Sequence, residues 1–484
     1  MTKTADIQNK GSDKTHLMNM TQGQPWRLIL RFALPLLLGN ILQQLYNIVD
    51  SAVVGNFVGK TALAAVGTAF PVIFLINSLF MGIGMGATII ISQYYGAGDR
   101  QSVKKAIDTI YLAMLVIVVP LSVLGILLSH PLLLLMNTPA DTIGQATTYM
   151  QIIFIGTLAS FGYNINSGIL QGLGDSRSPL IYLSIATVLN IILDLAFVLL
   201  WHWDVAGVAW ATIISQLVSF LFGIYHINRR QAYIRIHLRH LDFDWNILKD
   251  SVRLGLPAGL QNMFFSLGTM VLQSLINSYQ STFMAGFNGA SKIDSFAFLP
   301  LLTFSTAIMT YVGQNIGAGR LDRVKKGIRS TLVLSTVVSL AICTLILLTA
   351  GYLMRLFTDE PDVILAGEAY LIRVVPFYIL LSVLFIVNGA LRGAGESIIP
   401  LVATMASLWL ARVPLAYFLA DRFGRDNMFF SFPLGWLIGL AIVLPYYFSG
   451  RWRSKSMVRD IGGPSAAEAR IAGEAAVEKP EGSE

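Results

Sequence analysis

The sequence predicts an all-α integral membrane protein with about twelve transmembrane helices, arranged as two six-helix bundles related by a pseudo-two-fold axis along the membrane normal. Three observations predict this fold class: an apolar composition, a series of long hydrophobic runs and an internal duplication. Of the 484 residues, 55% are hydrophobic and only 13% are charged, and the mean hydropathy is +0.64. This balance is far too apolar for a soluble globular protein of this size.

Hydrophobic runs of roughly twenty or more residues recur along nearly the whole chain, and each can cross a hydrocarbon core about 30 Å thick. We expect the spans at residues 27–58, 61–93, 103–128, 143–171, 178–200 and 205–228, and then at 250–278, 283–315, 325–350, 364–391, 398–420 and 431–449.

The duplication appears when the chain is shifted by 221 residues. QYYGAGDRQSVKKAI (93–107) then overlies QNIGAGRLDRVKKGI (314–328), and GILQGLGDSRSPL (168–180) overlies GALRGAGESIIPL (389–401). Each half holds about six spans, an even number, so both copies enter the membrane the same way up. Two similar bundles suit alternating access to a site between them, although duplication also serves simply to build a large helical scaffold.

The domain organisation follows from these spans. Residues 25–228 form the N-lobe and 250–450 the C-lobe, joined by a basic linker at 229–249. Residues 1–24 read as a polar cytoplasmic tail without the apolar core and cleavage site of a secretory signal. Residues 451–484, rich in Ala, Gly and Glu towards the end, read as a disordered cytoplasmic tail.

Orientation follows from the basic residues. Most of the 34 lysines and arginines fall on the side that carries both termini, whereas the opposite loops hold Lys60, Arg355, Arg422 and Arg425. The positive-inside rule therefore predicts a multi-pass protein of the cell (inner) membrane with both termini in the cytoplasm. The net charge of +7 reflects topology and does not indicate nucleic-acid binding.

Catalytic and cofactor motifs are missing from the sequence. Cys343 is the only cysteine, and GNFVGKT (55–61) is one residue too short between its glycines to be a phosphate loop. No zinc-ligand or nucleophile motif is present. We therefore expect a protein that is not an enzyme, has no cofactor and does not use ATP, so an ion gradient is the natural energy source.

Two acidic side chains lie at bilayer depth in the first half, Asp50 and Asp194, each about ten residues below the outer end of its span. Asn190 precedes Asp194 by one helical turn on the same face, and Thr212 lies at a similar depth. No Lys or Arg lies within the spans of this first half, so the two carboxyl groups are protonated or hold a cation such as Na⁺. The alternative is that both acids only hydrogen-bond neighbouring helices.

The second half carries three further charges within spans: Lys292, Asp294 and Arg412. Since opposite charges are available here, a structural ion-pair network is as good an interpretation as a role in transport. Pro35 in the first span removes a backbone hydrogen bond and predicts a helix bend, which either couples ion binding to the shape of a cavity or is an ordinary kink.

The chain resembles the MATE (multidrug and toxic compound extrusion) transporters. The resemblance covers about residues 25–455 and rests on NIVDSAVVG around Asp50, PVIFLINSLFMGIGMGATIIISQYYGAGD (71–99), ILQGLGDSRSPL (169–180), ASKIDSFAFLP (290–300) and ALRGAGESIIP (390–400). It implies a V-shaped pair of lobes that exports cationic or amphipathic organic compounds in exchange for H⁺ or Na⁺. Its partners would be membrane lipids and these small substrates.

Within the family, the first-lobe acidic cluster is similar to that of the DinF-like branch, with Asn164 and Tyr149 as additional members. The second-lobe acids typical of the NorM branch are replaced by Phe265 and Leu381, which favours coupling through the first lobe. The superfamily also contains flippases for lipid-linked oligosaccharides, and lipid flipping is the alternative function. The sequence offers no strongly basic groove in the first lobe for a pyrophosphate head group, which argues against it.

Overall fold

The computed structural model describes residues 17–230, 234–236 and 241–458, and within them the chain is helical throughout its hydrophobic length. The first half contains α1 (Pro25–Val53), η1 (Val54–Val58), α2 (Lys60–Gly96), α3 (Arg100–Leu135), α4 (Ile143–Ile155), α5 (Thr157–Gly172), α6 (Arg177–Leu195), η2 (Ala196–Leu200) and α7 (Asp204–Arg230). The second half contains α8 (Trp245–Asn277), α9 (Ser281–Gly317), α10 (Leu321–Arg355), α11 (Pro361–Val374), η4 (Val375–Phe377), α12 (Tyr378–Gly393), α13 (Ile398–Met405), η5 (Ala406–Arg412), α14 (Val413–Phe423), η6 (Arg425–Phe430), α15 (Ser431–Ser449) and η7 (Arg451–Ser454).

The predicted membrane spans are confirmed as a class. Among the described residues, ten helical spans are long and apolar enough to cross a bilayer, and an eleventh is formed by α4 and α5, which meet at a 51° bend. Helix α8 has 33 residues and is also long enough, but it is more polar than the others. Counting α8, each half contributes six membrane-crossing segments.

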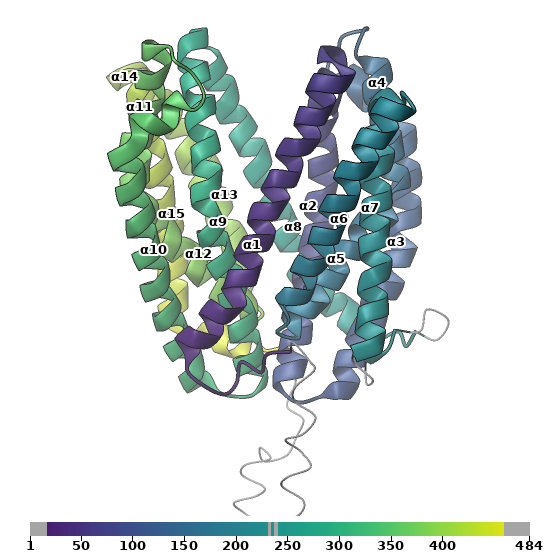
Figure 1. The fold of residues 1–484 in the computed structure, drawn as a ribbon. Coiled ribbons are helices and arrows are strands. Elements are labelled where there is room, and N and C mark those ends of the chain that lie inside the picture. The colour runs from purple at the N-terminus through teal and green to yellow at the C-terminus, as the bar shows by residue number, and fades with distance from the viewer. Residues whose placement is uncertain (1–16, 231–233, 237–240, 459–484) are drawn as a thin grey trace, which may run out of the picture.

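The helices form two lobes, with α2 to α7 in one and α9 to α15 in the other, and α1 and α8 running between them (Figure 1). The first half of α1 packs against the second lobe, where Phe32 belongs to the same hydrophobic core as Phe304, and Asn40 donates a hydrogen bond to Thr303. Its second half packs against α6. Each lobe thus receives one crossing helix that begins beneath the other lobe.

Glycines allow α8 to approach α2 closely. A side chain on Gly82 would overlap the backbone of Gly255 and Gly259, and one on Gly86 would overlap the carbonyl of Ser251. Small residues often allow such close packing in membrane proteins, because the hydrophobic effect does not drive helices together inside lipid.

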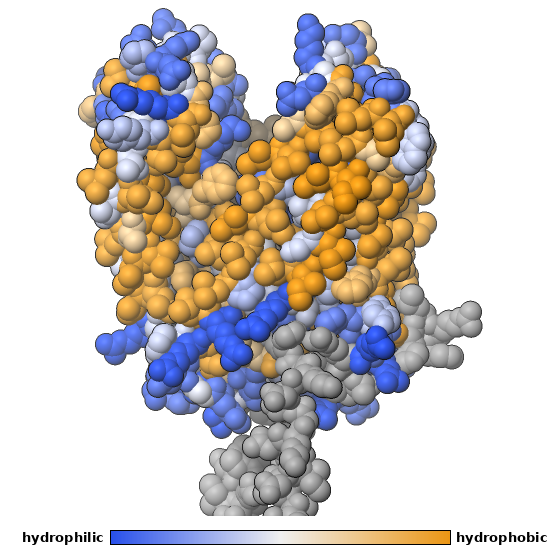
Figure 2. Space-filling model, viewed as in Figure 1, coloured by the Kyte–Doolittle hydropathy of each residue, from blue (hydrophilic) through white to orange (hydrophobic). Residues whose placement is uncertain are grey.

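Both ends of the described chain lie on one face of the molecule, which we call the terminal face (Figure 1). The lobes meet there, and the surface is hollowed between them at the opposite end (Figure 2). The belt around both lobes is hydrophobic and is bounded by hydrophilic side chains at each end (Figure 2), as expected of a protein that spans a bilayer.

Parts of the predicted tails belong to the folded structure. Residues 451–458, which the sequence places in the C-terminal tail, contact the helices, with Trp452 and Met457 buried. Residues 17–24 likewise pack beneath the lobes, where Met20 is fully buried. Residues 1–16 and 459–484, and part of the predicted linker at 229–249, lie outside the described residues.

Candidate ion-coupling site

Three helices of the first lobe bring the predicted coupling residues together. Asp50 lies one turn before the end of α1, Asn190 and Asp194 lie in the last two turns of α6, and Thr212 lies on α7. Helix α6 packs against both α1 and α7. Since Asn190 and Asp194 are four residues apart, they occupy one helix face.

The two acids lie near each other, and most of their carboxyl oxygens lack a hydrogen-bond partner within the described part of the chain. The carboxyl groups of Asp50 and Asp194 lie close enough to interact with each other, and Asp194 and Asn190 are completely buried. Among the described residues, Asp50 Oδ1, both oxygens of Asp194 and both polar atoms of the Asn190 side chain have no hydrogen-bond partner. Buried polar groups without partners are costly, so this cluster fits a bound proton or cation.

The ion pairs of the described residues do not include either acid; they join Lys104 to Asp108, Arg425 to Asp426 and Lys455 to Glu396. No group of three or more His, Cys, Asp or Glu side chains among these residues could hold a metal ion. A Na⁺ here would therefore be held by a mixed set of carboxylate, amide and hydroxyl oxygens, which are hard ligands.

Two tyrosines adjoin the acids. Tyr46, one turn before Asp50 on α1, donates a hydrogen bond of 3.3 Å to the hydroxyl of Thr212, and its ring lies near both acids. Tyr149, on α4, is 7% exposed and also lies near both. Tyr46 was not among the predicted site residues, although its spacing of four residues from Asp50 places it on the same face of the helix.

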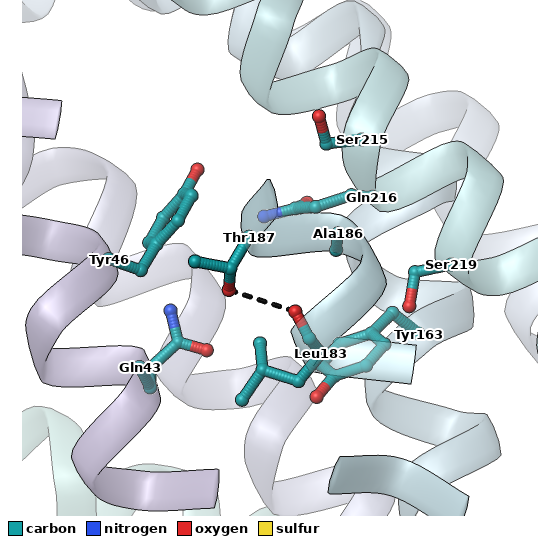
Figure 3. Close-up of a pocket in the computed structure, with 9 residues that line it drawn as sticks. All are labelled: Gln43, Tyr46, Tyr163, Leu183, Ala186, Thr187, Ser215, Gln216 and Ser219. Carbon is teal, nitrogen blue, oxygen red and sulfur yellow. Dashed lines mark hydrogen bonds between the residues drawn. The ribbon is translucent and has the colours of Figure 1, made fainter. Parts of the chain in front are cut away.

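A small polar cavity continues from this cluster towards the terminal face. It has a volume of about 30 Å³ and is lined by Gln43, Tyr46, Tyr163, Leu183, Ala186, Thr187, Ser215, Gln216 and Ser219. Figure 3 shows Gln43 and Tyr46 facing Thr187, Gln216 and Ser215 from across the cavity. This volume accommodates about two water molecules. Most of the lining residues lie on α1, α6 and α7, one to three turns below the acids, and Tyr163 of α5 completes the wall. The site therefore has a polar neighbour on that side.

The structure also places two further predicted residues, Asn164 and Pro35. Asn164 donates its amide hydrogen to the carbonyl of Ser160, one turn earlier in α5, and packs beside Gly84 of α2. Pro35 lies inside α1, where it leaves one backbone hydrogen bond unmade. Directly after the turn that carries Asp50, α1 continues as the π-helix η1.

The second lobe contains a separate polar cluster. Asp294 and Arg412 are each 5% exposed and line a cavity of about 330 Å³ with Tyr370 and several aromatic side chains. Tyr370 donates a hydrogen bond of 2.6 Å to Asp294 Oδ2, and the Arg412 guanidinium stacks 4.4 Å from the ring centre of Phe432. Asp294 Oδ1 and Arg412 Nε have no hydrogen-bond partner among the described residues.

Lys292 does not join this cluster. It is exposed and lines another pocket with Met354, Phe357 and Glu360, because two residues along a helix point in different directions. Of the three predicted charges, only Asp294 and Arg412 therefore share this cluster, and Tyr370 joins them. Phe265 and Leu381 both line the same cavity as Asp294, so this lobe keeps an acid although those two positions are apolar.

Comparisons with known proteins agree with this architecture. The MatE family profile matches residues 35–196 and again residues 257–418, two stretches of equal length that correspond to the duplicated halves. The chain is 32% identical to the probable multidrug resistance protein YpnP of Bacillus subtilis, over 91% of this chain and 98% of that protein. It is 28% identical to the probable multidrug resistance protein NorM of Thermotoga maritima, over 89% and 94%.

Among solved structures, the outward-facing conformation of a multidrug resistance MATE family transporter of the MOP superfamily aligns with a TM-score of 0.85. The identity is 25%, and the alignment covers 92% of this chain and all of the other. The duplicated profile match and the similarity to YpnP over nearly the full length show that this chain belongs to the MatE family.

Proposed function

We propose that this protein is a secondary antiporter that exports cationic or amphipathic organic compounds in exchange for H⁺ or Na⁺. The observation that carries this proposal is a buried site in which Asp50 and Asp194 lie near each other with unsatisfied oxygens and, among the described residues, without an ion-pair partner. Two neighbouring carboxylates in a low dielectric repel each other unless a proton or a cation lies between them. Drug resistance is the role in the names of the similar proteins from Bacillus subtilis and Thermotoga maritima.

Transport by alternating access suits the shape of the molecule. The lobes meet at the terminal face and separate at the opposite end (Figure 2), so a substrate between them would be open to one side only. The positive-inside rule supports a cytoplasmic terminal face, and the hollow then opens to the outside. The similarity to an outward-facing transporter supports the same assignment.

Coupling requires that the ion and the substrate either compete for the protein or stabilise different conformational states of it. Asp50 lies at the end of α1, and this helix contacts both lobes. A change of charge at Asp50 therefore acts on a helix that is well placed to influence how the lobes pack. Asn190 and Thr212 order the site, and Tyr149 closes its side.

The substrate class follows from the second-lobe cavity as much as from the names of relatives. This cavity is lined mainly by apolar and aromatic side chains, among them Phe265, Phe298 and Trp436, with one acid, Asp294, and one base, Arg412. Aromatic faces are suited to organic cations, and such cavities accept many shapes because few polar contacts fix the ligand.

Ethidium efflux from proteoliposomes tests this function. The purified full-length protein is reconstituted, and efflux is driven separately by an imposed pH gradient and by an imposed Na⁺ gradient. We expect efflux under one of the two gradients, which identifies the coupling ion. Absence of efflux under both would contradict drug antiport and favour the lipid-flippase alternative.

A further inference from the structure

The duplicated QxxGAG motifs meet at the terminal face and exchange hydrogen bonds between the lobes. The side-chain amide of Gln93, on α2, donates to the carbonyl of Gly393 at 2.9 Å. The side-chain amide of Gln314, on α9, donates to the carbonyl of Gly172 at 3.2 Å. The two pairs are related by the 221-residue repeat. Each lobe therefore donates one glutamine hydrogen bond to the other lobe and accepts one from it.

The glycines of the same motifs allow the two helix ends to touch. A side chain on Gly96 would overlap the backbone of Gln314, and one on Gly317 would overlap the backbone of Gln93. Neither glycine needs an unusual backbone conformation, because both lie within helices. Their value lies in the close approach of α2 to α9, which any larger residue would prevent.

The two chain ends complete this arrangement with the same symmetry. The amide of Met20 donates to Gln314 Oε1 at 2.8 Å, and the amide of Met457 donates to Gln93 Oε1 at 2.7 Å. Each glutamine therefore uses its donor and its acceptor at once, one to bind the other lobe and one to bind a terminal segment. Both side chains are completely buried.

Each terminal segment binds a glutamine of one lobe and also contacts the other lobe. The amide of Met18 donates to the carbonyl of Gly174 in the first lobe, whereas Met20 binds Gln314 in the second. At the other end, Lys455 packs on Gly395 in the second lobe, and Met457 binds Gln93 in the first. Gly174 and Gly395 both have positive φ, at 86° and 96°, and are again separated by the repeat.

The N-terminal segment is held most firmly on the second lobe. The Met20 carbonyl accepts hydrogen bonds from Asn315 at 3.1 Å and from Arg323 at 3.2 Å. The Thr21 carbonyl accepts one from Arg320 at 3.0 Å. Helix α1 begins shortly after this segment. The same contacts therefore fix the N-terminal end of α1, whose C-terminal end carries Asp50.

We propose that these contacts form a lock on the terminal face, in which Gln93 and Gln314 are positioning residues and the segments 18–20 and 455–457 are latches. This inference rests on the proposed alternation of access, since opening the terminal face requires the two lobes to separate there. The contacts described above join the two lobes directly or join a terminal segment to one of them, and each terminal segment binds both lobes at once. Separation of the lobes at the terminal face must therefore break the two glutamine–carbonyl hydrogen bonds and release each latch from one lobe. The lock therefore sets the balance between the two open states.

The test measures distances between spin labels in the full-length protein in lipid nanodiscs, with Cys343→Ala removing the native cysteine. One pair replaces the exposed residues Gln101 and Asp322 by cysteine on the terminal face, and another replaces the exposed residues Lys60 and Ser281 on the opposite face. Each pair joins repeat-related positions at the start of a helix. Opening of the terminal face lengthens the first distance and shortens the second.

We expect Gln93→Ala and Gln314→Ala each to raise the ratio of terminal-open to terminal-closed protein by about tenfold, equivalent to about 1.4 kcal/mol. Gly96→Ala should shift the ratio further because the added methyl group meets backbone. Gln151→Ala is the matched control, since Gln151 bonds the carbonyl of Ile126 within one lobe. Gly67→Ala is the control for the glycine, because its added methyl group meets open space.

A reversible cross-link provides a second test if these variants fold poorly. Ser92 and Gly313 are repeat-related and lie against each other between the lobes, and a Cβ on Gly313 would lie 3.0 Å from that of Ser92. Since disulfides have Cβ atoms about 3.5 to 4.5 Å apart, the two helices must move apart by about half an ångström to form the bond. Ser92→Cys with Gly313→Cys, in the Cys343→Ala background, should keep the terminal face closed when oxidised and release it on reduction. The single cysteine variants are the controls.

The proposal is overturned if the lock variants give the same distance distributions as Gln151→Ala, or if the oxidised double-cysteine protein still opens the terminal face. Neither readout needs a substrate or an ion gradient. A failure of ethidium efflux would therefore leave this result interpretable, and the two proposals are tested separately.

Discussion

The two lobes share one template but differ in the chemistry of their buried charges. Tyr149 and Tyr370 are related by the 221-residue repeat, and each lies beside an acid in its own lobe. In the first lobe the tyrosine adjoins two carboxyl groups that have no ion-pair partner among the described residues. In the second lobe it donates to one carboxyl group, and an arginine lines the same cavity.

This difference separates an ion site from a self-compensating cluster. Asp50 and Asp194 together carry an excess of negative charge that only a proton or a cation offsets. Asp294 and Arg412 offset each other without any ion, even though they do not form a close pair. The duplication thus conserved the helical scaffold, while each lobe acquired its own charges at positions that the repeat does not relate.

The largest expected effect is at the first-lobe acids. Asp50→Asn and Asp194→Asn should each reduce gradient-driven ethidium efflux to background in proteoliposomes, because an amide neither exchanges a proton nor balances a cation. Asp426→Asn is the control, since it removes the same charge at an exposed position. Wild-type efflux by both variants would remove the assignment of the coupling site.

The second-lobe cluster should respond in stability more than in coupling. Asp294→Asn leaves Arg412 buried without a neighbouring carboxylate, at a cost of at least about 1 to 3 kcal/mol. We expect a lower midpoint of thermal unfolding in detergent, and partial recovery in the double variant Asp294→Asn with Arg412→Met. If the double variant is no more stable than the single one, the two charges do not compensate each other.

A smaller effect is expected when the tyrosine of the second lobe loses its hydroxyl group. Tyr370→Phe removes the hydrogen bond to Asp294 and should cost about 1.5 kcal/mol, again measured by thermal unfolding. Efflux by this variant should keep the ion preference of the wild type. A change of preferred ion would show that the second lobe takes part in coupling, contrary to the comparison drawn here.

The smallest effect is expected at Asn164. Its amide bonds a carbonyl within its own helix, so Asn164→Ala should cost about 0.5 to 1 kcal/mol and change initial efflux rates by no more than about twofold. Asn190→Ala provides the contrast, because its buried side chain adjoins Asp194 in the site. A loss of coupling in Asn164→Ala equal to that in Asn190→Ala would extend the site beyond the residues described here.

Sequence reasoning predicted the helices correctly because hydrophobic length and spacing along a helix are local properties. The segment 143–171, for example, agrees with the bent pair α4 and α5 within a residue at each end. The proximity of Asp50 to Asp194 was also expected, since equal depth within one bundle leaves few arrangements.

The remaining features depend on how helices pack across the lobes, which one sequence does not reveal. The separation of Lys292 from Asp294 depends on the rotation of α9, and the burial of Arg412 depends on its stacking over Phe432. The role of Gln93 and Gln314 was hidden because the repeat marks the motifs but not the contact between them. The same holds for the terminal segments, which look polar and dispensable until their backbone amides are seen to bind those glutamines.

The most direct test of the central claim is ion release from purified protein when ethidium is added. Protons are followed with a pH indicator in weakly buffered detergent solution, and bound ²²Na⁺ is followed by filtration. We expect ethidium to displace one of these ions from the wild type and from Asp294→Asn, but from neither Asp50→Asn nor Asp194→Asn. Release that persists in both first-lobe variants and disappears in Asp294→Asn would place the coupling site in the second lobe and overturn the assignment of Asp50 and Asp194.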